Sequence, residues 1–249
     1  AWECGVHDEL LFERIFNKLE KSGGKPQFIY AMTISNHTPF AVPDTYKPYN
    51  ISLTEDIRKR LRTNEDLAIK NFTGYQYAND SLGRLIQRIR TSPYGGNTII
   101  VATGDHNTLQ LFDFTDSQLL QKLSVPLVMY VPEKYRPKQA IDTTVFSSHK
   151  DIFPTIFNLA LSDATYLKSG NNLFDAASTD SFAVNNYNVA MNKIGAVLIQ
   201  STPLYYRWKK DNSKLLEPTT AQETPGLEAL LKKAKASVAS MNYYVQTEL

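Results

Sequence analysis

The sequence predicts an α/β fold in which helices flank a mainly parallel sheet, with a small C-terminal antiparallel hairpin and a packing helix. Two short runs, residues 27–34 and 97–103, are apolar on both faces, which is typical of strands buried inside a parallel sheet. A helical pattern at 67–90 lies between them. A strand–helix–strand order with a short final loop is a right-handed crossover unit, and we therefore expect the two strands to run parallel.

The remaining elements of the first two thirds follow the same periodicities. Apolar residues recur at helical spacing from about 9 to 21, directly after Asp8, which we expect to cap that helix. A third strand is expected at 127–131, and a further helix begins near residue 151. The stretch 162–192 is small and polar in composition, so we expect loops there.

The C-terminal part has its own pattern. Two strand-like runs, 196–200 and 204–208, predict an antiparallel hairpin because a short turn sequence separates them. An amphipathic helix is expected from 227 to about 244. We therefore divide the chain into residues 1–175, an α/β domain, and residues 176–249, a subdomain of hairpin and helix.

Composition excludes several classes of protein. Of the 249 residues, 42% are hydrophobic and 21% are charged, which is enough to bury a sizeable core. The net charge of +2 gives no electrostatic ground for nucleic-acid binding. A single cysteine, Cys4, excludes an internal disulfide and any multi-cysteine metal site. No apolar run is long enough to span a bilayer, and the first residues carry neither an initiator Met nor a leader, so we expect an excised piece of something longer.

The strongest functional signal is Gly104-Asp105-His106, directly after the run 97–103. In open α/β sheets, ligands bind at the carboxyl ends of the strands. A carboxylate beside a neutral imidazole suits a borderline divalent ion such as Zn²⁺ or Mn²⁺. The alternative is a turn in which Asp105 caps the next element and His106 lies on the surface.

Histidines also follow or precede two other predicted elements. His37 comes just past the run 27–34, so parallel strands would bring it to the same crevice as Asp105 and His106. His149 precedes the helix near residue 151, and helix N-termini favour anions. The alternative for each is an ordinary surface or loop histidine that bonds a backbone carbonyl.

Four motifs, in this order, carry a resemblance to a known family. They are Gly5-Val6-His7-Asp8 with Leu11-Phe12, Ser35-Asn36-His37-Thr38-Pro39-Phe40, Gly104-Asp105-His106, and Asp151-Ile152-Phe153-Pro154-Thr155. Together they resemble the extracellular domain of lipoteichoic acid synthase-like phosphoglycerol transferases, in the sulfatase branch of the alkaline phosphatase superfamily. The resemblance covers residues 1 to about 175, and it implies that they are the C-terminal part of an incomplete sulfatase-like catalytic domain.

The resemblance implies roles for individual residues. Asp105 and His106 match the pair that binds the catalytic divalent ion, with Mn²⁺ expected and Zn²⁺, Mg²⁺ or Ca²⁺ as other options. His37 matches the histidine that contacts the phosphoryl group or the leaving group of the substrate. Asp151 matches a structural helix start. His149 has no assigned counterpart in the phosphoglycerol transferases, and it is a candidate additional site residue because other branches place a second-metal histidine in this region.

The family's nucleophile has no match in this chain. The transferases attack with a Thr well upstream of the motif that contains His37, and sulfatases use a modified Cys or Ser in Cys/Ser-x-Pro-x-Arg. Cys4 lacks the Pro and Arg that would follow. We therefore expect this fragment alone to bind metal weakly and to be inactive, while the parent transfers a phosphoglycerol or related headgroup through a covalent phospho-enzyme.

Two other functions stay open at this point. One is a sulfatase or phosphodiesterase of the same superfamily, and the other is a non-catalytic domain that binds an anionic glycan. A basic stretch at 58–62 is compatible with all three functions, or is simply solvated surface. The resemblance further implies a lipid- or glycan-linked phosphoglycerol substrate and no nucleic acid. It also implies a parent with N-terminal membrane helices and a catalytic domain on the extracytoplasmic face of a bacterial membrane, the piece itself being soluble.

Overall fold

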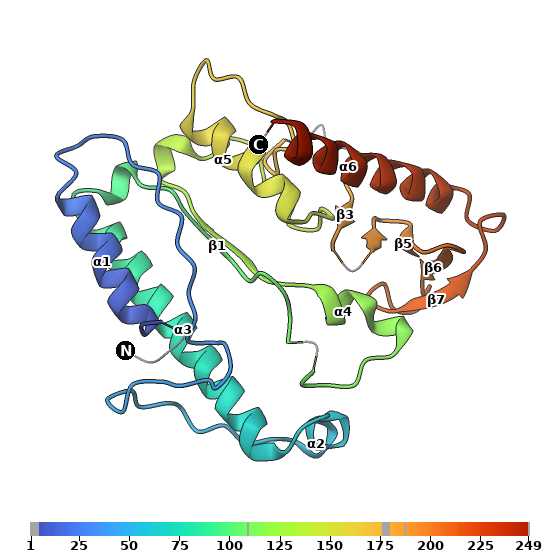
Figure 1. Ribbon diagram of the computed structural model, residues 1–249, viewed down its shortest axis with the longest axis horizontal. Coiled ribbons are helices and arrows are strands. Elements are labelled where there is room, and N and C mark those ends of the chain that lie inside the picture. Colours follow the sequence, from blue (N-terminus) through green and yellow to red (C-terminus); the bar gives the residue numbers. More distant parts are fainter. Residues whose placement is uncertain (1–4, 109, 176–179, 187, 249) are drawn as a thin grey trace. The chain divides into compact units, whose positions relative to one another are not determined.

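The computed structural model describes residues 5–108, 110–175, 180–186 and 188–248, so Cys4 lies outside the described residues. The chain forms two compact units (Figure 1). Unit 1 comprises Ala1–Asp113 and Val125–Lys134, and unit 2 comprises Phe114–Ser124 and Tyr135–Leu249. The division of the chain after residue 175 stays a prediction.

Unit 1 contains the helices α1 (Asp8–Glu20), α2 (Glu55–Arg60) and α3 (Glu65–Thr91). The helices α1 and α3 lie side by side (Figure 1). Their apolar faces meet in a small core formed by Phe12, Phe16, Leu85 and Ile89. The helices predicted at 9–21 and 67–90 are therefore confirmed.

Unit 1 also holds a two-stranded sheet of β1 (Ile100–Thr103) and β2 (Leu127–Tyr130). Ile100 lies opposite Tyr130 in this sheet, and the two strands run antiparallel. Strands are thus confirmed within the predicted ranges 97–103 and 127–131. The predicted parallel sheet is not confirmed, since every sheet in the described part of the chain is antiparallel.

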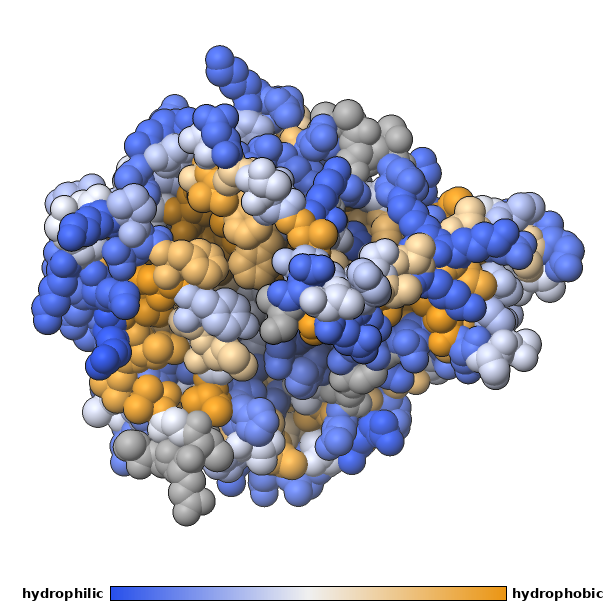
Figure 2. All heavy atoms as spheres, turned by 45° about the horizontal axis from the view of Figure 1, so that its top comes forward, coloured by the Kyte–Doolittle hydropathy of each residue, from blue (hydrophilic) through white to orange (hydrophobic). Residues whose placement is uncertain are grey.

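Residues 27–34 form no strand among the described residues, so that prediction is wrong. Apolar side chains reach the surface of the molecule (Figure 2), and in this segment Phe28, Tyr30 and Met32 are 68%, 72% and 74% exposed. β-Propensity reflects packing against neighbours in a sheet rather than an intrinsic backbone preference. The segment instead connects α1 to the loop at 34–40, and α3 consequently joins no pair of parallel strands.

Unit 2 is built on five antiparallel strands that are adjacent in chain order. They are β3 (Ala183–Val184), β4 (Val189–Met191), β5 (Gly195–Leu198), β6 (Leu204–Trp208) and β7 (Leu216–Thr219). The predicted hairpin is confirmed as β5 and β6, where Ala196 lies opposite Tyr206. The expectation of loops throughout 162–192 is wrong for β3 and β4, because strands of two or three residues are too short to show a period.

Helices cover both faces of this sheet. The helix α6 (Gly226–Glu248) packs Leu227, Leu230 and Leu231 onto one face, which confirms the final predicted helix. On the other face, α4 (Leu119–Leu123) brings Leu119 into a core with Tyr206. The alternation of side chains along β6 explains the two cores, since Tyr205 packs against the first and Tyr206 belongs to the second.

Another helix of unit 2, α5 (Ile152–Ala160), follows a single 3-10 turn, η4 (His149–Asp151). It confirms the helix predicted near residue 151. In the part of the chain that the structure describes, every helix is too short or too polar to cross a membrane.

Candidate active site

The Asp-His pair lies at the carboxyl end of β1, where the sequence predicts it. The side chains of Asp105 and His106 are 83% and 56% exposed. Asp105 Oδ2 lies 3.5 Å from His106 Nε2, and Asp105 Oδ1 accepts a hydrogen bond from the His106 backbone N–H at 2.9 Å. The turn therefore holds a carboxylate and an imidazole side by side and accessible from solvent.

A hydrogen bond selects the tautomer of His106. Its Nδ1 lies 2.9 Å from the backbone carbonyl oxygen of Asn107. Because a carbonyl oxygen only accepts, Nδ1 carries the proton of the neutral ring and Nε2 keeps its lone pair. Nε2 is the nitrogen that lies beside the carboxylate of Asp105. The pair therefore offers one nitrogen and one oxygen donor in the same place, a combination that suits a borderline divalent ion.

Two ligands are fewer than a metal site needs. Zinc sites in proteins use three or four protein ligands. Among the described residues, no group of three or more His, Cys, Asp or Glu side chains is arranged to hold a metal ion. Asp105 and His106 thus fit a divalent ion in kind, but they are too few to form a complete site by themselves.

His37 lies in unit 1, in a loop of two successive turns at 34–40. Its backbone N–H donates to the Ile34 carbonyl at 2.9 Å, and its carbonyl accepts from the Phe40 N–H at 2.7 Å. The residue is exposed, and its Nδ1 lies 3.0 Å from the carbonyl oxygen of Thr38. As in His106, this leaves the lone pair on Nε2. Among the described residues, His37 and Asp105 belong to no group of three or more metal-ligating side chains.

The loop that carries His37 is held by a residue to which the sequence assigns a different role. Asp8 is expected to cap α1, but the N-cap is His7 and Asp8 is the first helical residue. Its Oδ1 accepts hydrogen bonds from the Ile34 N–H at 3.1 Å, the Ser35 N–H at 3.0 Å and the Ser35 hydroxyl at 2.8 Å. Asp8 and Ser35 stand in two of the four family motifs, and that is the one sequence signal that links them.

His149 lies in unit 2, where it is exposed at the start of η4. Asp151, two residues on, is buried and accepts hydrogen bonds from the Ser148 N–H at 2.9 Å, the Asn171 N–H at 2.8 Å and the Lys150 ammonium at 2.6 Å. Burial lowers the pKa of Lys150, and the adjacent Asp151 carboxylate opposes this shift. These contacts make Asp151 an anchor for the start of α5, while a site role for His149 stays a prediction.

The basic stretch at 58–62 is largely neutralised within unit 1. Its ion pairs, at 2.9, 2.8 and 3.2 Å, are Arg58–Glu65, Lys59–Glu55 and Arg62–Asp113. The fourth cation, Arg60, places its guanidinium 5.8 Å from the ring centre of Phe112. The positive charges of Arg58, Lys59 and Arg62 are therefore matched by carboxylates of the same unit.

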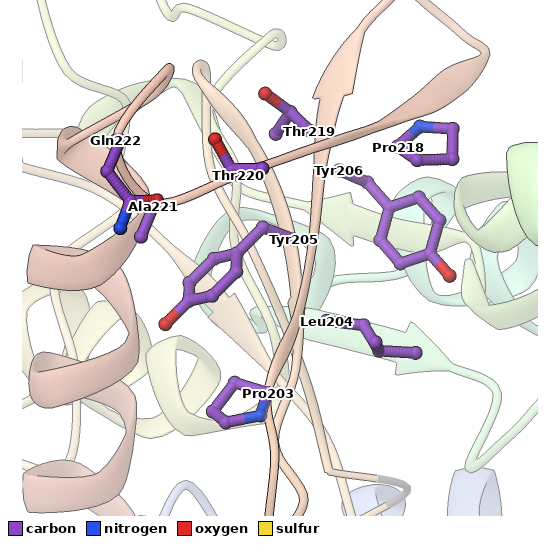
Figure 3. A pocket seen from close by; sticks show the side chains of 9 residues that line it. All are labelled: Pro203, Leu204, Tyr205, Tyr206, Pro218, Thr219, Thr220, Ala221 and Gln222. Atoms are coloured by element: carbon purple, nitrogen blue, oxygen red, sulfur yellow. The ribbon is translucent and has the colours of Figure 1, made fainter.

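A pocket of about 400 Å³ lies in unit 2, between β6, β7 and the turn that leads to α6 (Figure 3). Figure 3 shows that the side chains of Tyr205 and Tyr206 extend to opposite sides of β6. The lining residues are Pro203, Leu204, Tyr205, Tyr206, Pro218, Thr219, Thr220, Ala221 and Gln222. None of these nine is charged, so the pocket offers no opposite charge to a phosphate group.

Comparison with known proteins identifies relatives of the chain. A family model described as Sulfatase matches residues 1–162. Two curated relatives are both phosphoglycerol transferase I. The one from Xanthomonas axonopodis pv. citri (strain 306) is 27% identical over 146 residues, and the one from Xanthomonas campestris pv. campestris is 26% identical over 143 residues. Each match covers 57% of this chain but 18% of the relative, so the chain spans less than a fifth of the length of these relatives.

Solved structures share the fold. A protein in the alkaline phosphatase superfamily from Vibrio parahaemolyticus matches with a TM-score of 0.73 and 19% identity, over 100% of this chain and 56% of that one. The lipoteichoic acid synthase LtaP from Listeria monocytogenes matches with a TM-score of 0.68 and 17% identity, over 96% of this chain and 60% of that one. The family match takes in more than half of the chain and confirms the resemblance seen in the four motifs. This chain belongs to the sulfatase family.

Proposed function

We propose that this chain is part of the active site of a metal-dependent transferase of phosphoglycerol, or of a related phosphoryl headgroup, that acts on cell-envelope lipids or glycans. The observation that carries the proposal is the exposed pair of Asp105 and His106 at the end of β1. The pair occurs in a chain of the sulfatase family whose curated relatives are named phosphoglycerol transferase I. In this proposal the headgroup passes through a covalent phospho-enzyme.

Asp105 and His106 are the residues of this chain that would hold the divalent ion, through a carboxylate oxygen and Nε2. We propose Mn²⁺, with Zn²⁺, Mg²⁺ and Ca²⁺ as alternatives, and further ligands from outside the described residues. When bound, such an ion neutralises charge on a phosphate and lowers the pKa of a coordinated hydroxyl.

His37 would act on the substrate directly. Its Nδ1 is engaged by the Thr38 carbonyl, so Nε2 is the nitrogen that can reach a ligand. In the protonated ring, Nε2–H donates to a non-bridging oxygen of the phosphoryl group or delivers a proton to the leaving alkoxide. The exposure of His37 is consistent with contact to a substrate that arrives from solvent.

The nucleophile, in this proposal, comes from polypeptide outside this chain. Because the chain covers 18% of each curated relative, the complete reaction is a property of the whole protein. We propose that this protein is anchored in a bacterial membrane and that residues 1–249 lie on its extracytoplasmic side.

Turnover of labelled phosphatidylglycerol by the full-length natural protein with Mn²⁺ tests the proposal. His37→Ala and Asp105→Ala are each expected to lower turnover by about 100-fold or more, whereas Asp56→Ala, an exposed change in α2, retains it. Wild-type turnover in either site variant would contradict the proposal. Label that moves to an added acceptor identifies a transferase, and label released as free glycerol phosphate identifies a hydrolase.

A further inference from the structure

The first residue of α1 is tied to the loop of His37 rather than to its own helix. Asp8 is 1% exposed, and four hydrogen bonds join it to Ile34 and Ser35. Three of them end on Oδ1, and the fourth runs from the Asp8 N–H to the Ser35 hydroxyl oxygen at 3.1 Å. An ionised acceptor makes hydrogen bonds roughly twice as strong as neutral ones. The connection is therefore a strong one between segments 27 residues apart.

A single residue, Ile34, connects the hydrogen bonds of Asp8 to the backbone of His37. The Ile34 N–H donates to Asp8, while the Ile34 carbonyl accepts from the His37 N–H at 2.9 Å. Ile34 is thus fixed on one side by Asp8 and bonded on the other to the backbone of His37. A shift of the Asp8 carboxylate would therefore move Ile34 and the backbone of His37 together.

The same loop also packs closely against α3. A Cβ added at Gly74 would lie 3.2 Å from the Ser35 carbonyl oxygen and 3.6 Å from Asn36 Oδ1. The loop therefore packs against a helix position that has no side chain, with Asp8 on α1 as its other support. The loop that carries His37 is thus in contact with both α1 and α3.

A role in helix stability alone does not account for Asp8. The side chain of the N-cap residue His7 makes no capping bond to α1, and Asp8 does not replace it, because its Oδ1 accepts hydrogen bonds from the loop instead. Its other oxygen, Oδ2, is buried and has no hydrogen-bond partner among the described residues, an arrangement that costs free energy. An exposed acidic residue such as Glu9 interacts with the helix dipole without that cost.

We infer that Asp8 is a positioning residue for His37, an inference that rests on the role proposed for His37. The carboxylate holds the turn 34–37 so that the imidazole meets the phosphoryl group in one geometry. Misplacement of a reacting group by about 1 Å can cost about 100-fold in rate. We expect Asp8→Asn and Ser35→Ala each to lower turnover by about 10- to 100-fold, although neither residue contacts the substrate in this account.

The first experiment measures amide hydrogen–deuterium exchange in the full-length natural protein. Asp8→Asn and Ser35→Ala are expected to speed the exchange of the hydrogen-bonded amides of His37 and Phe40, while the matched control Glu9→Gln, in the same helical turn, leaves it unchanged. Unchanged exchange at both amides in both variants would overturn the inference, whatever the protein's activity. Ser35→Ala serves as the second variant if Asp8→Asn does not fold.

The second experiment separates positioning from a general loss of folded protein. Turnover of labelled phosphatidylglycerol by the full-length natural protein is compared in wild type, Asp8→Asn, His37→Ala and the double variant. If Asp8 acts through His37, Asp8→Asn has no further effect once His37 is absent. If Asp8→Asn lowers turnover by the same factor in the His37→Ala background as in the wild-type background, the inference is overturned. Full activity of His37→Ala would instead overturn the proposed function.

Discussion

The Ser35 hydroxyl makes two hydrogen bonds with Asp8, because it donates to Asp8 Oδ1 at 2.8 Å and accepts from the Asp8 N–H at 3.1 Å. Both residues are buried. Ser35→Ala would leave the Asp8 N–H without this acceptor, and we expect it to lower the free energy of unfolding by about 1–3 kcal/mol. Urea denaturation measures the loss. The exposed Ser52→Ala is the control and should stay within about 0.5 kcal/mol of wild type.

Alanine substitutions at two glycines distinguish two effects on stability, the loss of backbone freedom in the unfolded chain and a steric clash in the folded one. Gly83 lies inside α3, and a Cβ there meets nothing within 4 Å. Gly83→Ala should therefore stabilise the protein by about 0.5–1 kcal/mol. Gly195 begins β5, where a Cβ would overlap the carbonyl oxygen of Tyr206. Gly195→Ala should destabilise by about 1–3 kcal/mol, and the same sign for both variants in denaturation curves would contradict this account.

Tyr46 should make the free energy of unfolding depend on pH in the alkaline range. Burial, together with the hydrogen bond and charge of Asp80, raises the pKa of Tyr46 from 10.0 to about 12. Its hydroxyl donates to Asp80 Oδ2 at 2.6 Å. The native state therefore holds the proton more tightly than the unfolded chain, so this contribution is fully present below about pH 10 and is lost as pH rises toward about 12. Unfolding free energies measured across this range should fall less steeply in Tyr46→Phe, and an unchanged slope would count against the assignment.

Much of the helical structure can be predicted from the sequence, because each helix carries its own apolar period. The 3.6-residue pattern locates α1, α3 and α6 to within a few residues. Strand partners are different, since pairing joins segments that have no fixed sequence spacing. The run at 27–34 has the composition of a strand and forms none among the described residues. In contrast, β3 and β7 are strands with weak patterns, stabilised by their neighbours in the five-stranded sheet.

In the candidate site, too, local features can be predicted from the sequence and long-range contacts cannot. Asp105 and His106 are adjacent in sequence, so one turn after β1 suffices to place them side by side. The support of His37 by Asp8 depends on a contact across 27 residues between a helix start and a loop. No periodicity encodes such a contact, and an acidic residue at a helix start predicts a cap first. Long-range polar contacts of this kind require the folded structure.

The most direct measurement of the central claim is the intact mass of the full-length natural protein, quenched during reaction with phosphatidylglycerol and Mn²⁺. A covalent phospho-enzyme built around Asp105, His106 and His37 predicts an added mass of one glycerophosphoryl group in wild type. The same experiment with Asp105→Ala should show no adduct, because that variant lacks one of the proposed ligands. Equal adduct in both proteins, or turnover by wild type with no adduct at any quench time, would contradict the account.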